Sequence, residues 1–138
     1  MSALKKHWPW VPSLILAALM FMMAVPKLMS APSPMALFGA IDSWLGIQSL
    51  FEPYLRYVVG AAECLTGLLL LMPARRVWGA LLSLAIILVA LFFHLAGPLY
   101  PSGTVGEPAI FFMALLILAL TLVLLYIDRG KIPLIGKS

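Results

Sequence analysis

The sequence predicts an all-α polytopic membrane protein, a membrane four-helix bundle formed by a single domain over residues 1–138. Three observations lead to this prediction: 64% of the residues are hydrophobic, only 10% are charged, and the apolar residues fall into long runs separated by short polar turns. A soluble domain is usually about half apolar and about a quarter charged. A mean hydropathy of +1.10 excludes a disordered chain and a nucleic-acid-binding module, and argues against a soluble enzyme. The expected surroundings are a lipid bilayer.

The first span is expected over residues 8–28. Two lysines precede its apolar run, which is also typical of a secretory signal peptide. The residues that follow make a poor cleavage site, because Met29 and Ala31 would occupy the recognition positions and Pro32 would follow the cut. We therefore expect the segment to be retained as a membrane span.

A short helix is expected between the first and second spans, within residues 31–51. Its apolar residues recur at helical spacing among prolines, glycines and polar residues. They are Leu37, Phe38, Ile41, Trp44 and Leu45. This pattern predicts an amphipathic helix lying at the membrane interface, with Trp44 as an anchor. An ordered loop is the alternative.

Three further spans are expected over residues 53–72, 77–96 and 108–127. Each begins or ends at a proline, a glycine or a basic residue, and each has about the twenty residues that a bilayer core requires. The fourth span carries Thr121 as its only polar side chain within the membrane. We therefore expect that helix to be the one most exposed to lipid.

The basic residues predict the orientation. With four spans, seven of the nine lysines and arginines fall on one side, and Lys27 and Arg56 fall on the other. The seven are Lys5, Lys6, Arg75, Arg76, Arg129, Lys131 and Lys137. Because cytoplasmic segments carry an excess of Lys and Arg, both termini are expected in the cytoplasm, in a multi-pass protein of the plasma (inner) membrane.

Glu63 is the charge that membrane topology does not explain. It lies near the middle of the second span, where a charge costs roughly 2.5–3.5 kcal/mol on insertion scales. His94 lies in the third span, and the two Cα atoms should differ in height by roughly 9 Å at 1.5 Å per residue. Helical side chains lean toward their own N-terminus, so in antiparallel spans these two lean toward each other. A direct or water-bridged contact is expected.

Stripes of small residues predict that the first three spans pack closely on one another. The stripes contain Ser13, Ala17, Met20, Ala24 and Lys27; Glu52, Arg56, Val59 or Gly60, Glu63 and Gly67; and Gly79 or Ala80, Ser83, Ile87, Ala90 and His94. From them we predict a ligand pocket or proton site. Its residues are Glu63, His94, Arg56, Lys27, Gly60 and Gly67.

A purely structural network is the alternative to this pocket. Arg56 could neutralise Glu63 while His94 caps the network, and Lys27 could be an anchor that snorkels to the membrane surface. No catalytic residue is assigned. No metal site is predicted, because His7 and His94 fall on opposite sides of the membrane. The lone Cys64 excludes an internal disulfide and a thiol relay within this chain.

Several of these segments resemble the DoxX family of small membrane proteins, over nearly the whole chain. Residues 24–28 read Ala-Val-Pro-Lys-Leu, similar to the family's Gly-x-x-Lys-Leu ending with Ala24 in the glycine's place. Residues 59–71 read Val-Gly-Ala-Ala-Glu-Cys-Leu-Thr-Gly-Leu-Leu-Leu-Leu, similar to Glu-x-x-Gly-Gly-Leu-Leu-Leu, with Thr66 replacing the first glycine. The short basic turn at residues 73–76 and an alanine-rich third span ending at His94 also match.

The resemblance implies a four-helix membrane bundle. It also implies a link to quinones, since the family is named for a small subunit of a quinone-linked oxidase associated with thiosulfate oxidation. We expect a quinone- or lipid-binding subunit of a membrane redox system, at most an accessory subunit of an oxidoreductase. It would have no intrinsic cofactor, and a redox partner protein or further copies of itself would assemble with it. A non-catalytic assembly helper is the alternative, and a transporter or channel formed by an oligomer is a third.

Overall fold

The computed structural model describes residues 10–100, 103 and 108–129, and the regular structure in those ranges is helical. It contains the α-helices α2 (Trp10–Leu28), α3 (Pro32–Leu45), α4 (Arg56–Leu70), α5 (Arg76–Ala96) and α6 (Pro108–Ile127). A π-helical segment, Phe51–Leu55, leads into α4, and a 3-10 turn, Pro73–Arg75, joins α4 to α5. Some residues used to predict the orientation or to exclude a metal site lie outside the described ranges: Lys5, Lys6, His7, Lys131 and Lys137.

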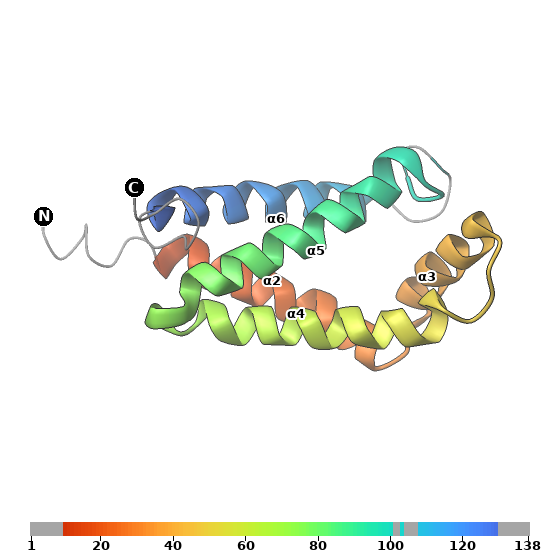
Figure 1. The fold of residues 1–138 in the computed structure, drawn as a ribbon, viewed down its shortest axis with the longest axis horizontal. Coiled ribbons are helices and arrows are strands. Elements are labelled where there is room, and N and C mark those ends of the chain that lie inside the picture. Colours follow the sequence, from red (N-terminus) through yellow and green to blue (C-terminus); the bar gives the residue numbers. More distant parts are fainter. Residues whose placement is uncertain (1–9, 101–102, 104–107, 130–138) are drawn as a thin grey trace, which may run out of the picture.

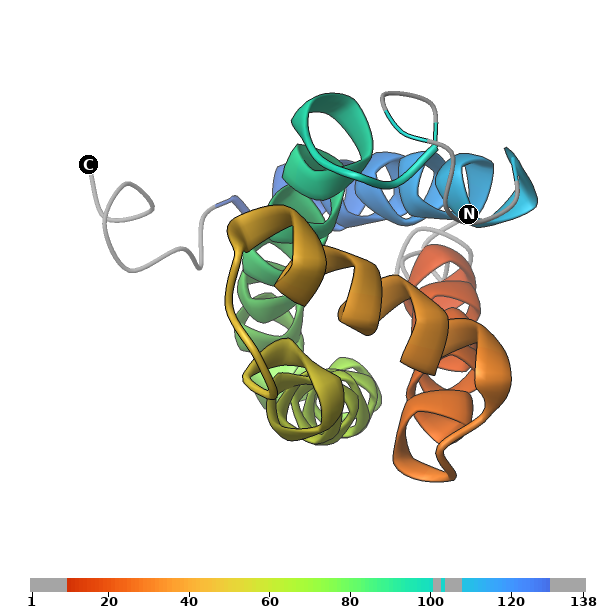
Figure 2. The same ribbon diagram turned by 90° about the vertical axis from the view of Figure 1, so that its right-hand side faces the viewer.

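Four long helices run alongside one another (Figure 1). Helix α2 packs on α4, α4 packs on α5, α5 packs on α6, and α6 also contacts α2. The N-terminal ends of α2 and α5 lie at the same end of the bundle as the C-terminal ends of α4 and α6 (Figure 1). Each helix is therefore antiparallel to its packing partners. The short helix α3 crosses the opposite end of this group (Figure 2).

Among the described helices, α2, α5 and α6 are long and apolar enough to cross a membrane. The second expected span differs, because α4 itself has 15 residues. That is about 22 Å at 1.5 Å per residue, less than a bilayer core of about 30 Å. The chain bends at Glu52, which has extended backbone angles (φ −115°, ψ 115°). The cause is local, since the residue before a proline, here Pro53, is sterically disfavoured in the helical region.

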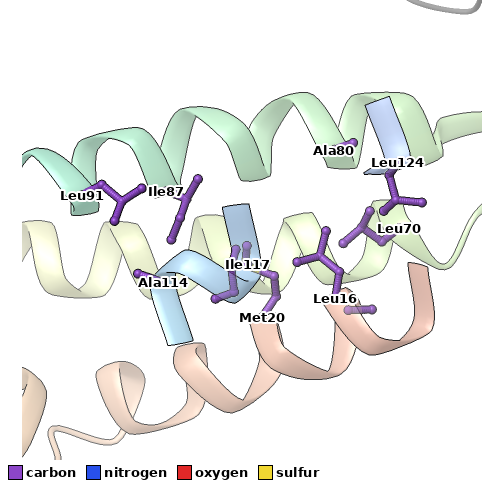
Figure 3. Close-up of a cluster of buried hydrophobic side chains, with 10 residues drawn as sticks. Leu16, Met20, Leu70, Ala80, Ile87, Leu91, Ala114, Ile117 and Leu124 are labelled. Carbon is purple, nitrogen blue, oxygen red and sulfur yellow. The ribbon is translucent and has the colours of Figure 1, made fainter. Parts of the chain in front are cut away.

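The core lies between the four long helices, and its side chains come from all of them (Figure 3). It consists of Leu16, Ala17, Met20, Leu70, Ala80, Ile87, Leu91, Ala114, Ile117 and Leu124. The predicted small-residue stripes are largely buried, which confirms the faces expected for the first three spans. Of the three candidate spans, α6 is the least buried, with 22% of its most apolar window inside the protein against 39% for the others. This agrees with its expected exposure to lipid.

Three buried hydroxyl groups form two links between helices inside this core. Ser83 Oγ on α5 lies 2.7 Å from Thr121 Oγ1 on α6, and Thr121 also donates to the carbonyl of Ile117. Ser13 Oγ on α2 donates to the carbonyl of Leu70, at the end of α4, over 2.7 Å. Each bond gives a polar atom a partner that the apolar surroundings do not supply.

A buried ion pair closes the end at which α2 begins. Arg76, the first residue of α5, donates from Nε and Nη2 to the two carboxylate oxygens of Asp128, just after α6, over 2.8 and 2.9 Å. The guanidinium carbon also lies 5.4 Å from the centre of the Trp10 ring. The two hydrogen bonds join the start of α5 to the end of α6, and the ring contact adds the start of α2.

Helix α3 confirms the helix expected between the first two spans. It ends at Leu45 and is followed by Gly46, whose φ of 73° lies in the left-handed region that favours glycine. Asp42 accepts hydrogen bonds from the backbone nitrogens of Phe51 and Glu52 over 2.8 and 3.0 Å. Trp44 packs edge-to-face on Phe93 of α5, with ring centroids 6.1 Å apart. These contacts fix α3 across the end of the long helices.

Candidate ligand cavity at Glu63

An apolar cavity of about 350 Å³ lies between the long helices at the α3 end. It falls within the range of about 300–1,000 Å³ that is common for small-molecule sites. Most of the side chains that line it are hydrophobic, and they come from α2, α3, α4, α5 and α6. Lys27, Glu63 and His94 are the ionisable side chains among them. The cavity lining is therefore mainly hydrophobic and includes three ionisable side chains.

Helix α3 forms part of the wall, and the sequence did not reveal this role. Leu37, Phe38 and Ile41 line the cavity from α3, and Figure 2 shows this helix crossing the end of the long helices. The apolar residues at helical spacing in this segment predict an amphipathic helix whose apolar face contacts the membrane interface. In the structure, part of that apolar face covers the protein's own cavity.

Lys27 and Glu63 form an ion pair inside the protein. Lys27 Nζ lies 3.0 Å from Glu63 Oε1, donates a hydrogen bond to Oε2 over 3.3 Å, and donates another to the carbonyl of Met23 over 3.1 Å. Lys27 is 8% exposed and Glu63 is 4% exposed. The proposed alternative that Lys27 snorkels to the membrane surface is therefore wrong, because its ammonium group turns inward to a carboxylate.

One oxygen of Glu63 has no hydrogen-bond partner within the described structure. This atom, Oε1, is buried, and the hydrogen bond from Lys27 is directed at Oε2 instead. Its charge is nevertheless balanced, because the ammonium of Lys27 lies 3.0 Å away. A carboxylate has about four lone-pair positions, so Glu63 could accept a further hydrogen bond from a molecule held in the cavity.

His94 occupies the same cavity wall but does not pair with Glu63. Its Nδ1 lies 2.6 Å from the carbonyl oxygen of Tyr100, and its ring packs 5.5 Å from that of Phe111. Because a carbonyl oxygen only accepts, Nδ1 carries the hydrogen and Nε2 is the nitrogen left for acid–base chemistry. The expected direct contact with Glu63 is not formed: in the described residues, each side chain has a different protein partner.

Arg56 lies outside the cavity, contrary to its predicted place in the pocket. It donates from Nε and Nη2 to the carboxylate of Glu52 over 2.6 and 2.8 Å. Its Nη1 donates to the carbonyl of Lys27 and, over 3.1 Å, to Ser30 Oγ. The alternative in which Arg56 neutralises Glu63 is therefore also wrong. Arg56 instead binds the last turn of α2 and so positions Lys27.

Gly60 and Gly67 also lie outside the cavity lining and face α2 instead. A Cβ atom at Gly60 would come within 3.0 Å of Leu28 and 3.2 Å of Lys27, and one at Gly67 would come within 2.6 Å of the Phe21 ring. The absent side chains allow α2 and α4 to approach closely. Their contribution to the site is indirect, because this approach brings Lys27 within reach of Glu63.

The described residues therefore form a helical protein with three helices suited to crossing a membrane and an apolar cavity between its helices, with an ion pair in the cavity lining. No family model, curated protein or solved structure matches the chain.

Proposed function

We propose that the chain is a multi-pass protein of the plasma (inner) membrane, a four-helix bundle with both termini in the cytoplasm. The remaining crossing, between α2 and α5 in the chain, would be formed by the residues after the bend at Glu52, from 53 to the end of α4 at 70. These 18 residues span about 27 Å of helix. Arg75, Arg76 and Arg129 lie at the end where α2 begins, which supports a cytoplasmic location for that end.

Reporter fusions test this topology. Alkaline phosphatase, which is active only outside the cytoplasm, should be inactive when fused after residue 138 and active when inserted at residue 103. A fluorescent protein that folds only in the cytoplasm should give the opposite pattern. Activity of alkaline phosphatase at both sites would overturn the proposed topology.

Within this membrane protein, the cavity is proposed to bind a quinone, in either redox state, or a similar lipid-soluble ring compound. The observation that carries the proposal is the buried ion pair of Lys27 and Glu63 in the lining of an apolar cavity. The resemblance to the DoxX family supports it, because two of the segments that carry the resemblance contribute Lys27 and Glu63, and these residues form one ion pair.

The residues of the wall suit the proton chemistry of such a molecule. Glu63 and His94 Nε2 can each accept a proton from a hydroxyl group or return one to a carbonyl oxygen, and Lys27 balances the charge of the carboxylate. The apolar lining would hold the ring and exclude water. Electrons would pass to or from a partner protein, so the chain would serve as the binding subunit of a membrane redox system.

A binding measurement with a cavity-filling variant tests the proposal. The purified protein in lipid nanodiscs is titrated with short-tailed quinone and quinol analogues, and its tryptophan fluorescence is followed. Ala62→Leu adds three carbons to a residue of the cavity lining and should abolish binding. Ala61→Leu makes the same change at the exposed neighbouring position outside the lining and should preserve binding. If neither analogue binds the wild-type protein, the proposal fails and the non-catalytic helper gains support.

A further inference from the structure

We infer that the ligand of this cavity is a ring compound with one long hydrocarbon tail, and that it enters from the bilayer through a lateral opening between α4 and α5. The inference rests on the proposed function and adds to it the path and the shape of the ligand. The ring lies in the cavity beside Glu63, and the tail passes between the two helices into the surrounding lipid.

Helices α4 and α5 are in close contact at one end and separate toward the other. Near the turn that joins them, a Cβ atom at Gly79 would lie 2.9 Å from the backbone nitrogen of Leu70. From this turn the two helices diverge toward the α3 end (Figures 1 and 2). The cavity lies at that end, and side chains of both helices line it. Whether the cavity is open on this side therefore depends on the side chains there.

The exposed side chains of the cavity lining mark its opening. Among the described lining residues, the exposed ones all belong to α4 or α5, and they are Val58, Ala85 and Val89. Val58 is 59% exposed and Val89 is 58% exposed. A side chain that lines a cavity and also faces the outside lies at the rim of an opening. The cavity therefore opens between α4 and α5.

The other sides of the cavity are closed by buried side chains. At the α3 end, Ile41, Phe93 and Leu99 form a buried apolar cluster, and Phe51 packs edge-to-face on Phe93 with ring centroids 5.6 Å apart. The lining residues of α2 and α6 are buried or half-buried. In the part of the chain that the structure describes, the route from outside is therefore the one between α4 and α5.

The opening faces hydrocarbon in the proposed topology. Ala85 and Val89 lie about 14 and 20 Å along α5 from Arg76, at 1.5 Å per residue. These heights fall within a bilayer core of about 30 Å. On α4, Glu63 is the charged residue that follows Arg56, and its side chain is buried. A molecule that passes this rim therefore comes from the lipid.

The size of the cavity indicates the shape of the ligand. Its volume of about 350 Å³ is near the lower end of the range of about 300–1,000 Å³ for small-molecule sites. Such a volume accommodates a ring with small substituents. A hydrocarbon tail long enough to hold the molecule in a bilayer has to lie outside it, and the apolar rim at Val58, Ala85 and Val89 lets such a tail reach the lipid.

Photocrosslinking tests the path of the tail. The probe is a benzoquinone with a decyl tail that carries a diazirine on the tail carbons next to the ring. The protein in lipid nanodiscs is irradiated with and without an excess of the tailless quinone, and labelled residues are mapped by mass spectrometry. Labelling that the competitor suppresses should fall on Val58, Ala85 and Val89. Leu65 and Leu88 are exposed on the same helices outside the lining, so their labelling, from probe dissolved in the lipid, should not change.

The outcomes separate this inference from the proposed function. Tryptophan quenching by the tailless quinone is measured in the same nanodiscs. If the quinone quenches but the suppressed labelling falls on α2, α3 or α6, or is absent, the lateral opening is overturned and the ligand cavity stands. If the quinone does not quench and no labelling is suppressed, both are overturned.

A paired variant at the rim gives an independent test. Val58→Phe with Val89→Phe should weaken binding of the tailed quinone at least about tenfold and that of the tailless quinone by less than about threefold, because the larger rings block the tail and not the cavity. Leu65→Phe with Leu88→Phe makes the same change outside the lining and should preserve both affinities. An equal loss for the two quinones would count against the lateral opening.

Discussion

The ammonium group of Lys27 lies 3.0 Å from the carboxylate of Glu63, and the two residues are 36 positions apart in the chain. Both side chains are at least nine-tenths buried. Such a pair is weak evidence for stability, because removing two charges from water costs several kcal/mol per ion, which their mutual attraction must offset. An apolar pair would fill the same space, so we attribute the presence of these charges to the cavity that they line.

A double-mutant cycle tests this interpretation. Lys27→Met and Glu63→Leu should each lower the free energy of unfolding by about 3–5 kcal/mol, because each leaves an uncompensated buried charge. The double variant should recover most of this loss and no longer bind ligand. The measurement is unfolding by denaturing detergent, followed by tryptophan fluorescence. Additive losses in the double variant would show that the residues do not act as a pair.

Arg56→Lys should destabilise the protein although it conserves the charge. The guanidinium group donates to Glu52, Ser30 and the carbonyl of Lys27 at once, and a lysine cannot reproduce this planar fork. The expected loss is about 1–3 kcal/mol, the cost of leaving buried polar atoms without partners. Ligand affinity should fall as well, since the last turn of α2 carries Lys27. Arg75→Lys, at an exposed arginine, serves as the control and should have almost no effect on either measurement.

Gly79→Ala should be costly, while Gly39→Ala should be neutral or stabilising. A Cβ atom at Gly79 would lie 2.9 Å from the backbone nitrogen of Leu70, so α4 and α5 would have to separate. A Cβ atom at Gly39, inside α3, would meet nothing within 4 Å. We expect a loss of about 1–3 kcal/mol in the first case and a gain of about 0.5–1 kcal/mol in the second. Equal melting temperatures would contradict the close contact of α4 and α5.

Asp128→Asn should weaken the end of the molecule where α2 begins. The change keeps the shape of the side chain but leaves the buried Arg76 without a counter-charge, at a cost of about 3 kcal/mol. Because the pair is buried, the destabilisation should persist at high salt. Arg129→Gln removes an exposed charge from the next position, and should change stability by less than about 1 kcal/mol. Thermal unfolding at low and high salt distinguishes the two.

The helices themselves could be predicted because their signals are local. The predicted fourth span, residues 108–127, has the same bounds as α6, and the third differs from α5 by one residue at its start. Prolines, glycines and arginines mark these ends. The second span was predicted less well, because Pro53 bends the chain at Glu52 before regular α-helix begins at Arg56.

The partner of Glu63 could not be predicted from helical periodicity. Periodicity shows which residues share a face of one helix, and it correctly placed Arg56, Glu63 and Lys27 on inward faces. It does not give the relative heights of two packed helices or the direction of a long side chain. Arg56 extends to the end of α2, so Lys27 becomes the residue opposite Glu63. The shape of the cavity could not be predicted from the sequence either, because it depends on how side chains from five helices pack together.

The bonds at the end of α2 have a consequence for biogenesis. The carbonyl and the ammonium group of Lys27 both find their partners on α4, at Arg56 and Glu63, 29 and 36 positions further along the chain. A ribosome therefore releases α2 well before the residues that neutralise it. In a bilayer, α2 alone would carry an unpaired charge, and so would α4 alone. We expect the translocon to hold the first helix until the second arrives and to release them into the lipid as one hairpin.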